Sequence, residues 1–154
     1  MLWRRYRLAL LWSVPIGVAI GCVLSLGLYL GGNPDYRSQG GWGAFAYLLG
    51  VGACVGGVTA LSALIGGVLA VLLADRRLSR PPRFRVRGGA AGAAAGAAAL
   101  WLAVGMGNAL TSSTGAAWFS GFAAVAALTA AVSGAVALLL LTRAERAQPI
   151  SQHH

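Results

Sequence analysis

The sequence predicts an all-α integral membrane protein, a four-helix bundle with its N-terminus and C-terminus in the cytoplasm. Three observations predict this fold. Of the 154 residues, 58% are hydrophobic, and the mean hydropathy is +0.73. Only 10% are charged, whereas soluble domains carry about 25%. The net charge of +9 comes from 12 Arg against 3 acidic residues, and the Arg lie between long uncharged stretches. This composition excludes a soluble enzyme, a disordered tail and a disulfide-rich scaffold.

Four stretches are long enough to cross a bilayer, since a transmembrane helix needs about 20 apolar residues to span roughly 30 Å of hydrocarbon. We expect helices rather than barrel strands because none of the stretches alternates in hydrophobicity. The chain is predicted to be a single transmembrane domain over residues 1–154, with a basic cytoplasmic loop at 74–87 and a short cytoplasmic tail at 142–154. The predicted spans are residues 8–30, 42–73, 88–110 and 116–141.

The distribution of Arg predicts the orientation. With four crossings, eleven of the Arg lie on one side of the membrane and only Arg37 lies on the other. Because positive charge stays in the cytoplasm, both termini and the 74–87 loop are predicted to be cytoplasmic. The absence of Lys and the abundance of Ala and Gly indicate a bacterial chain in the plasma (inner) membrane, with multiple passes.

The first span begins like a secretory signal, with Arg4 and Arg5 followed by an apolar run. That run exceeds the 7–15 residues of a signal peptide, and no small-residue cleavage site ends it, so we expect an uncleaved span. Cys22 and Cys54 lie within spans and are expected to be small apolar packing residues. A disulfide or a metal pair is the alternative for these two cysteines.

The second span is too long for a simple crossing. A helix over residues 42–73 would measure about 48 Å at 1.5 Å per residue. Two explanations stay open: residues 42–48 lie along the outer interface, or the helix breaks at one of the glycines between residues 50 and 57. The first is favoured because aromatic residues, which prefer the membrane interface, cluster here. They are Trp42, Phe45 and Tyr47.

The third span begins with a stretch, residues 88–99, composed entirely of Gly and Ala. Residues four apart lie on one helix face, and a stripe of glycines, a glycine zipper, lets two helices approach closely in lipid. The close contact is expected either within the bundle or with another subunit. The predicted helix-packing residues are Gly17, Gly21, Gly52, Gly56, Gly88, Gly92 and Gly96.

The basic loop contains the one concentration of charge. Arg83, Arg85 and Arg87 alternate with Phe84 and Val86, so an extended strip would present three guanidinium groups on one side. We expect this loop to bind anionic lipid headgroups. Docking of an acidic or phosphorylated partner is the alternative, and no nucleic acid is expected. The residues assigned to this contact are Arg76, Arg77, Arg80, Arg83, Arg85 and Arg87.

Catalytic chemistry has no evident place in the spans, because none of them contains an ionisable residue, the usual mark of function there. The only His are His153 and His154, and no pair of carboxylates is available for acid–base work. We therefore expect no enzyme activity, no cofactor and no metal. Trp101 lies near the middle of the third span, where it is expected to pack or contact lipid, with substrate stacking as the alternative.

The function that these features favour is that of a non-catalytic accessory or scaffold subunit, packed by Gly and Ala faces against other subunits of a larger membrane complex. The alternative is a small homo-oligomeric channel or transporter whose pore is shared between copies. That alternative depends on a break in the second span and on hydroxyl side chains such as those of Thr59 and Ser62.

Overall fold

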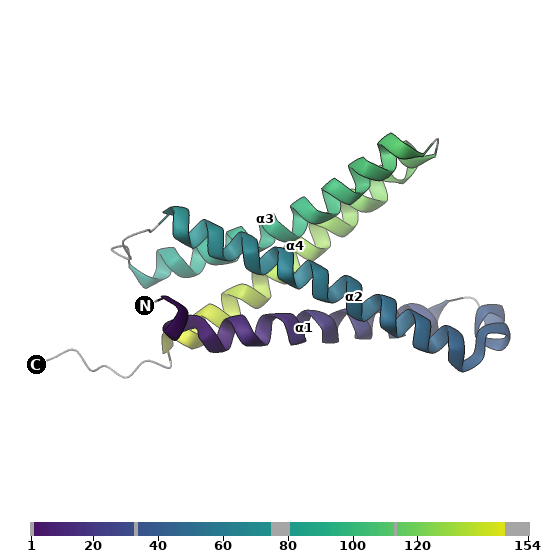
Figure 1. Cartoon of the computed structure of the whole chain (residues 1–154), viewed down its shortest axis with the longest axis horizontal. Helices are drawn as coiled ribbons and strands as arrows, with labels where there is room; N and C mark the ends of the chain where they lie inside the picture. The colour runs from purple at the N-terminus through teal and green to yellow at the C-terminus, as the bar shows by residue number, and fades with distance from the viewer. Residues whose placement is uncertain (1, 33, 75–80, 113, 147–154) are drawn as a thin grey trace, which may run out of the picture. The chain divides into compact units, whose positions relative to one another are not determined.

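The computed structural model describes residues 2–32, 34–74, 81–112 and 114–146. Within these residues the chain is all-α, as predicted, and each helix contains an apolar stretch long enough to cross a membrane. Four such stretches fit a multi-pass membrane protein. The helices are α1 (Leu2–Gly31), α2 (Pro34–Ala74), α3 (Pro82–Thr111) and α4 (Gly115–Arg146) (Figure 1).

Prolines and hydroxyl side chains determine where α3 begins and ends. Pro81 is extended, with φ −57° and ψ 149°, and Pro82 occupies the first helical position, where its missing N–H costs nothing. At the other end Ser112 is extended, and its N–H and hydroxyl both donate to the carbonyl of Asn108, at 3.1 and 2.9 Å. Backbone groups left over at the helix end are thereby satisfied. The helix continues no further, and α4 starts at Gly115.

The chain divides into two compact units. In the first, residues 11–61, the second part of α1 packs antiparallel against the first part of α2. The second unit comprises residues 62–154 with residues 1–10. There α3 packs antiparallel against both the end of α2 and α4, and Figure 1 shows α3 and α4 side by side along their lengths.

A kink at Gly41 separates residues 34–40 from a helix that continues to Ala74. Gly41 has φ 48° and ψ −142°, and no other residue of α2 has non-helical dihedral angles. The predicted alternative of a break among the glycines between residues 50 and 57 is therefore wrong. A break in the apolar stretch would leave backbone groups without partners in lipid, whereas Gly41 lies beside a polar loop where water can satisfy them. Residues 42–48 belong to the long helix, so the separate segment is 34–40.

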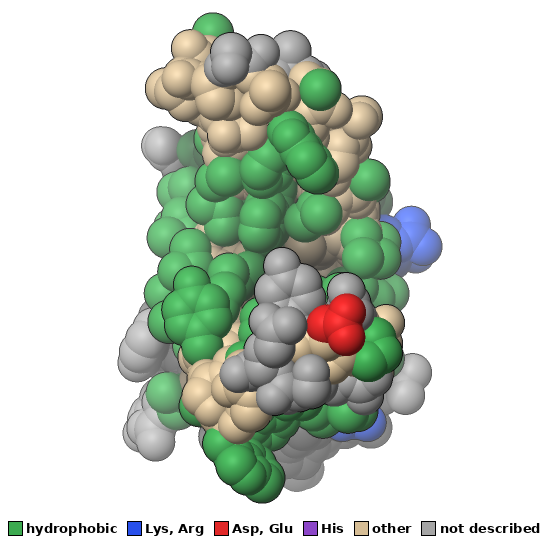
Figure 2. Space-filling model, turned by 90° about the vertical axis from the view of Figure 1, so that its right-hand side faces the viewer, with side chains coloured by type: hydrophobic (Ala, Val, Ile, Leu, Met, Phe, Trp, Pro, Cys, Tyr) green, Lys and Arg blue, Asp and Glu red, His purple; other side chains and the backbone are tan. Residues whose placement is uncertain are grey.

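The buried hydrophobic side chains are small. Among the described residues they are all alanines, whereas many large ones are exposed, such as Trp42 at 85% and Leu110 at 81%. Hydrophobic side chains gather over the middle of the face shown in Figure 2. This arrangement suits a bilayer, because lipid is as apolar as Leu and helices associate through small residues. The buried alanines are Ala63, Ala90, Ala93, Ala97 and Ala126.

Candidate functional site

Four of the predicted packing glycines meet in the first unit. A Cβ added to Gly21 would overlap the carbonyl oxygen of Gly52, and one added to Gly52 would lie 2.6 Å from the carbonyl oxygen of Gly21. Gly17 and Gly56 face each other one turn further along, where a Cβ on Gly17 would lie 2.8 Å from the Gly56 oxygen. The backbones of α1 and α2 thus approach so closely that no side chain fits between them.

Gly92 and Gly96 make the equivalent contact in the second unit. A Cβ on Gly92 would lie 2.5 Å from the carbonyl oxygen of Gly66 on α2, and one on Gly66 would lie 2.9 Å from the Cα of Gly96. Gly88 differs from the other predicted packing residues, because a Cβ there would meet nothing within 4 Å. The contact between α2 and α3 therefore includes Gly92 and Gly96 but leaves Gly88 open.

Gly66 and Gly105 are two of the glycines in close contacts that the sequence prediction missed. Gly66 has no glycine four residues away, but it lies between Ser62 and Ala70, and this small-residue spacing was the available signal. Gly105 lies where α3 packs closely against α4, since a Cβ added to Gly105 would lie 2.6 Å from the Cβ of Phe122. No spacing pattern marks Gly105, because its partner is a large side chain rather than a second small one.

Three hydroxyl groups within the described spans bond to backbone carbonyls. The Ser62 hydroxyl donates to the carbonyl of Gly96 across the α2–α3 contact, at 2.7 Å. Thr59 donates to Val55 and Thr129 donates to Val125, each at 2.8 Å and each four residues back in the same helix. Such bonds satisfy a hydroxyl in an apolar environment without any partner from outside the helix.

Helix α3 presents small residues on a third side as well. Its glycines contact α2 and α4, yet Ala91, Ala95 and Ala99 are exposed. These three residues, four apart, lie along one face, which we call the alanine face. Large apolar side chains such as Leu102 and Met106 return on the following turns, at 40% and 56% exposure. Within residues 81–112 and 114–144, the other side chains leave the alanine face exposed.

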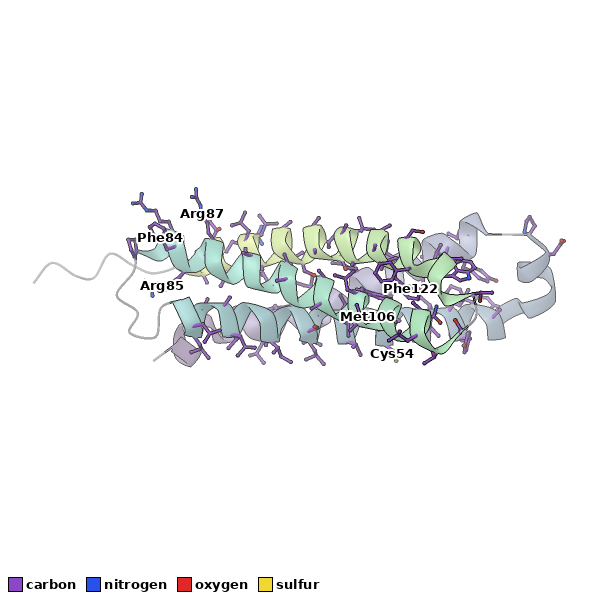
Figure 3. The ribbon with its side chains drawn as sticks, turned by 90° about the horizontal axis from the view of Figure 1, so that it is seen from above. Cys54, Phe84, Arg85, Arg87, Met106 and Phe122 are labelled. Carbon is purple, nitrogen blue, oxygen red and sulfur yellow. The ribbon has the colours of Figure 1, made fainter. Side chains whose placement is uncertain are left out.

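The basic residues at the start of α3 are helical. The expectation of an extended strip with three guanidinium groups on one side is wrong, because Pro81 and Pro82 start the helix before them. Alternating residues then point in opposite directions: Arg83 and Arg87 are exposed, whereas Arg85 is only 9% exposed. Figure 3 shows Arg85 and Arg87 on opposite sides of α3. The other predicted contacts, Arg76, Arg77 and Arg80, lie outside the described residues.

An aromatic cluster surrounds the kink at Gly41. The Tyr29 hydroxyl donates to the Gly41 carbonyl at 3.5 Å, and the Tyr29 ring meets Phe45 edge-on with centroids 5.5 Å apart. Trp42 meets the same Phe45 ring at 5.7 Å. The cluster lies against the kink inside α2, where Gly41 adopts a conformation that only glycine adopts without strain.

Cys22, Cys54 and Trp101 show no arrangement that indicates chemistry. Both cysteines are free thiols, and that of Cys22 donates to the Leu49 carbonyl at 3.9 Å. The indole nitrogen of Trp101 is buried and has no hydrogen-bond partner among the described residues.

No protein-family model matches this chain, and no match to a curated protein or to a solved structure was found.

Proposed function

We propose that this protein is a non-catalytic accessory or scaffold subunit that binds another membrane protein through the alanine face of α3. The observation that carries the proposal is the exposure of Ala91, Ala95 and Ala99 on a helix whose other sides pack against α2 and α4. Large side chains stand at many other exposed positions, such as Val23 at 67% and Leu128 at 60%, although α4 also exposes Ala127, Ala131 and Ala135.

Small residues on an exposed membrane face favour a protein partner over lipid. Helices associate in a bilayer through van der Waals contact and backbone hydrogen bonds, and Gly and Ala permit the close approach that both require. A row of methyl groups offers lipid chains few contacts, since each pair of atoms contributes only about 0.1–0.2 kcal/mol. A second helix packed into the row would make many more of them.

The remaining features of the proposal concern placement and chemistry. The chain is proposed to form a four-helix bundle in a bacterial plasma membrane, with both termini and the loop between α2 and α3 in the cytoplasm. The asymmetric distribution of Arg supports this orientation. A non-catalytic role is supported by the uncharged interior of the four apolar stretches, which provides no acid or base.

The alternative, a homo-oligomeric channel or transporter, rests on two features of the sequence. One was a break in the middle of the second span, but α2 is helical from Trp42 to Ala74. The other was the hydroxyl groups of Thr59 and Ser62, and these donate to the Val55 and Gly96 carbonyls. No observation therefore favours a pore over a packing role.

Gentle detergent extraction followed by native mass measurement tests the proposal. The wild-type chain should leave the membrane with another protein in a fixed ratio, and Ala95→Leu should release that protein, because the larger side chain separates the helices. Val104→Leu is the matched control, since it enlarges an exposed side chain (45%) of the same helix outside the alanine face. A wild-type chain that is always monomeric would contradict the proposal, and a homo-oligomer would support the alternative.

A further inference from the structure

We infer that Arg83 and Arg87, on the exposed side of α3, bind the phosphate of an anionic phospholipid, and that Arg85 takes no part in this site. The inference stands apart from the proposed function, because it concerns the end of α3 rather than the alanine face. We call Arg83, Phe84 and Arg87 the basic face.

The position of the basic face matches the depth of lipid phosphates. Arg83 and Arg87 are four residues apart and therefore lie on one side of the helix, and both are exposed. Arg87 directly precedes Gly88, where the uncharged part of α3 begins. The guanidinium groups consequently lie at the boundary between the apolar stretch and the polar surroundings, which is where a bilayer presents its phosphates.

Phe84 supports a lipid as the source of the phosphate. Its ring is 54% exposed, and the guanidinium carbon of Arg83 lies 5.6 Å from the ring centroid. Exposed aromatic rings favour the membrane interface, and a guanidinium beside a ring retains its planar set of donors, which fits phosphate oxygens in pairs. One helical turn therefore places the Phe84 ring for contact with the acyl chains at the interface and the Arg83 guanidinium for contact with the lipid headgroup.

Electrostatics at this end of α3 favour an anion from outside the protein. A helix N-terminus carries about half a positive charge and is normally accompanied by acidic residues, but the first turn of α3 contains none. Arg143 adds a further exposed positive charge at the same end of the α3–α4 pair, where Gly89 faces Leu141. A bound phosphate would offset the repulsion among these groups.

Arg85 provides the contrast that the structure adds to the sequence. It lies on the opposite side of α3 from Arg87 (Figure 3), its side chain is buried, and it interacts with the rest of the protein. All three Arg have the same charge and lie within five residues of one another. If the lipid phosphate contacts exposed guanidinium groups, its binding depends on Arg83 and Arg87 but not on Arg85. If the lipid is attracted only by the net positive charge of the protein, its binding depends on all three Arg equally.

Native mass spectrometry of the full-length chain in detergent, titrated with phosphatidylglycerol or phosphatidylcholine, tests the inference. One basic residue near an anionic surface contributes about 1 kcal/mol, which is about five-fold in a binding constant. We expect Arg87→Gln to weaken the first phosphatidylglycerol about five-fold and the Arg83→Gln/Arg87→Gln double variant about 25-fold. Phosphatidylcholine binding should not change, because its headgroup carries no net charge.

Arg85→Gln and Arg37→Gln are the charge-matched controls, and both should retain phosphatidylglycerol binding within two-fold. Arg37→Gln keeps the comparison valid if Arg85→Gln does not fold, which circular dichroism would reveal. An equal loss in Arg37→Gln and Arg87→Gln would overturn the inference, and so would a wild-type chain without preference for phosphatidylglycerol. Displacement of the lipid by an equal concentration of glycerol phosphate would assign the site to a soluble phosphate ester and overturn the lipid assignment.

Discussion

Replacing Gly92 with Ala adds a single methyl group at the closest contact between α2 and α3. The new Cβ would lie 2.5 Å from the carbonyl oxygen of Gly66 and 3.1 Å from its carbonyl carbon, and would overlap the Cβ of Ala70. Ordinary contact begins at 3.4 Å. All three neighbouring atoms belong to the backbone or to a Cβ, and none can move aside by changing rotamer. The two helices must therefore separate.

The separation needed is about 0.5 to 1 Å, a gap that removes a quarter to a half of the dispersion energy of each atom pair. If the α2–α3 contact holds about 50 pairs at about 0.15 kcal/mol each, the loss is roughly 2 to 4 kcal/mol. The hydrogen bond from Ser62 to Gly96, now 2.7 Å long, would also stretch, at a further cost of about 0.6 kcal/mol. We expect Gly92→Ala to lower the unfolding free energy by about 3 kcal/mol.

Reversible unfolding with dodecyl sulfate in mild detergent micelles, followed by circular dichroism, measures this loss. Gly88→Ala is the matched control on the same helix, since a Cβ there meets nothing within 4 Å, and it should leave stability unchanged or raise it slightly, because Ala favours helix more than Gly. Gly92→Leu should prevent stable folding altogether, while Leu100→Ile should be tolerated. Equal stability of Gly92→Ala and Gly88→Ala would refute the close-contact reasoning.

Two further predictions use the same unfolding measurement. Ser62→Ala removes the hydrogen bond between α2 and α3 and should lower the unfolding free energy by about 0.6 kcal/mol. Thr129→Val removes a bond within one helix and should lower it by less. An equal loss in both variants would contradict a stabilising role for the Ser62 bond. Gly41→Ala places a side chain at φ 48° and ψ −142° and should cost about 1–3 kcal/mol, while Gly43→Ala, in open helical surroundings, should cost nothing. A tolerated Gly41→Ala would show that the turn can relax.

The helical fold was predictable because a bilayer leaves the chain few choices. Backbone groups in hydrocarbon must bond within their own segment, so four long uncharged stretches predict four helices without any knowledge of their packing. The start of α3 was harder, because the alternation of Arg83, Arg85 and Arg87 suits an extended strip as well as a helix. The two prolines before Arg83 decided it, since Pro81 is extended and Pro82 presets the first helical turn.

The spacing of glycines in the sequence and the close contacts between helices coincide only in part. Spacing by four identified Gly17, Gly21, Gly52 and Gly56, and the structure places these four together between α1 and α2. Spacing alone predicted that Gly88 and Gly92 are both packing residues, although of these two only Gly92 lies close to a neighbouring helix. A repeat marks which residues share a face, but it contains no information on where along that face the partner helix ends.

Composition and charge by themselves determined that this chain is helical, apolar and asymmetric in its Arg, because these properties follow from the cost of placing backbone and charge in lipid. Tertiary structure alone decided which glycines lie in close contact with a neighbouring helix, that Ser62 bonds to Gly96, and that Arg85 is buried while Arg83 and Arg87 remain exposed. The physical reason is that each of these features depends on the distance between two helices, and a sequence specifies that distance only through the sum of all their contacts.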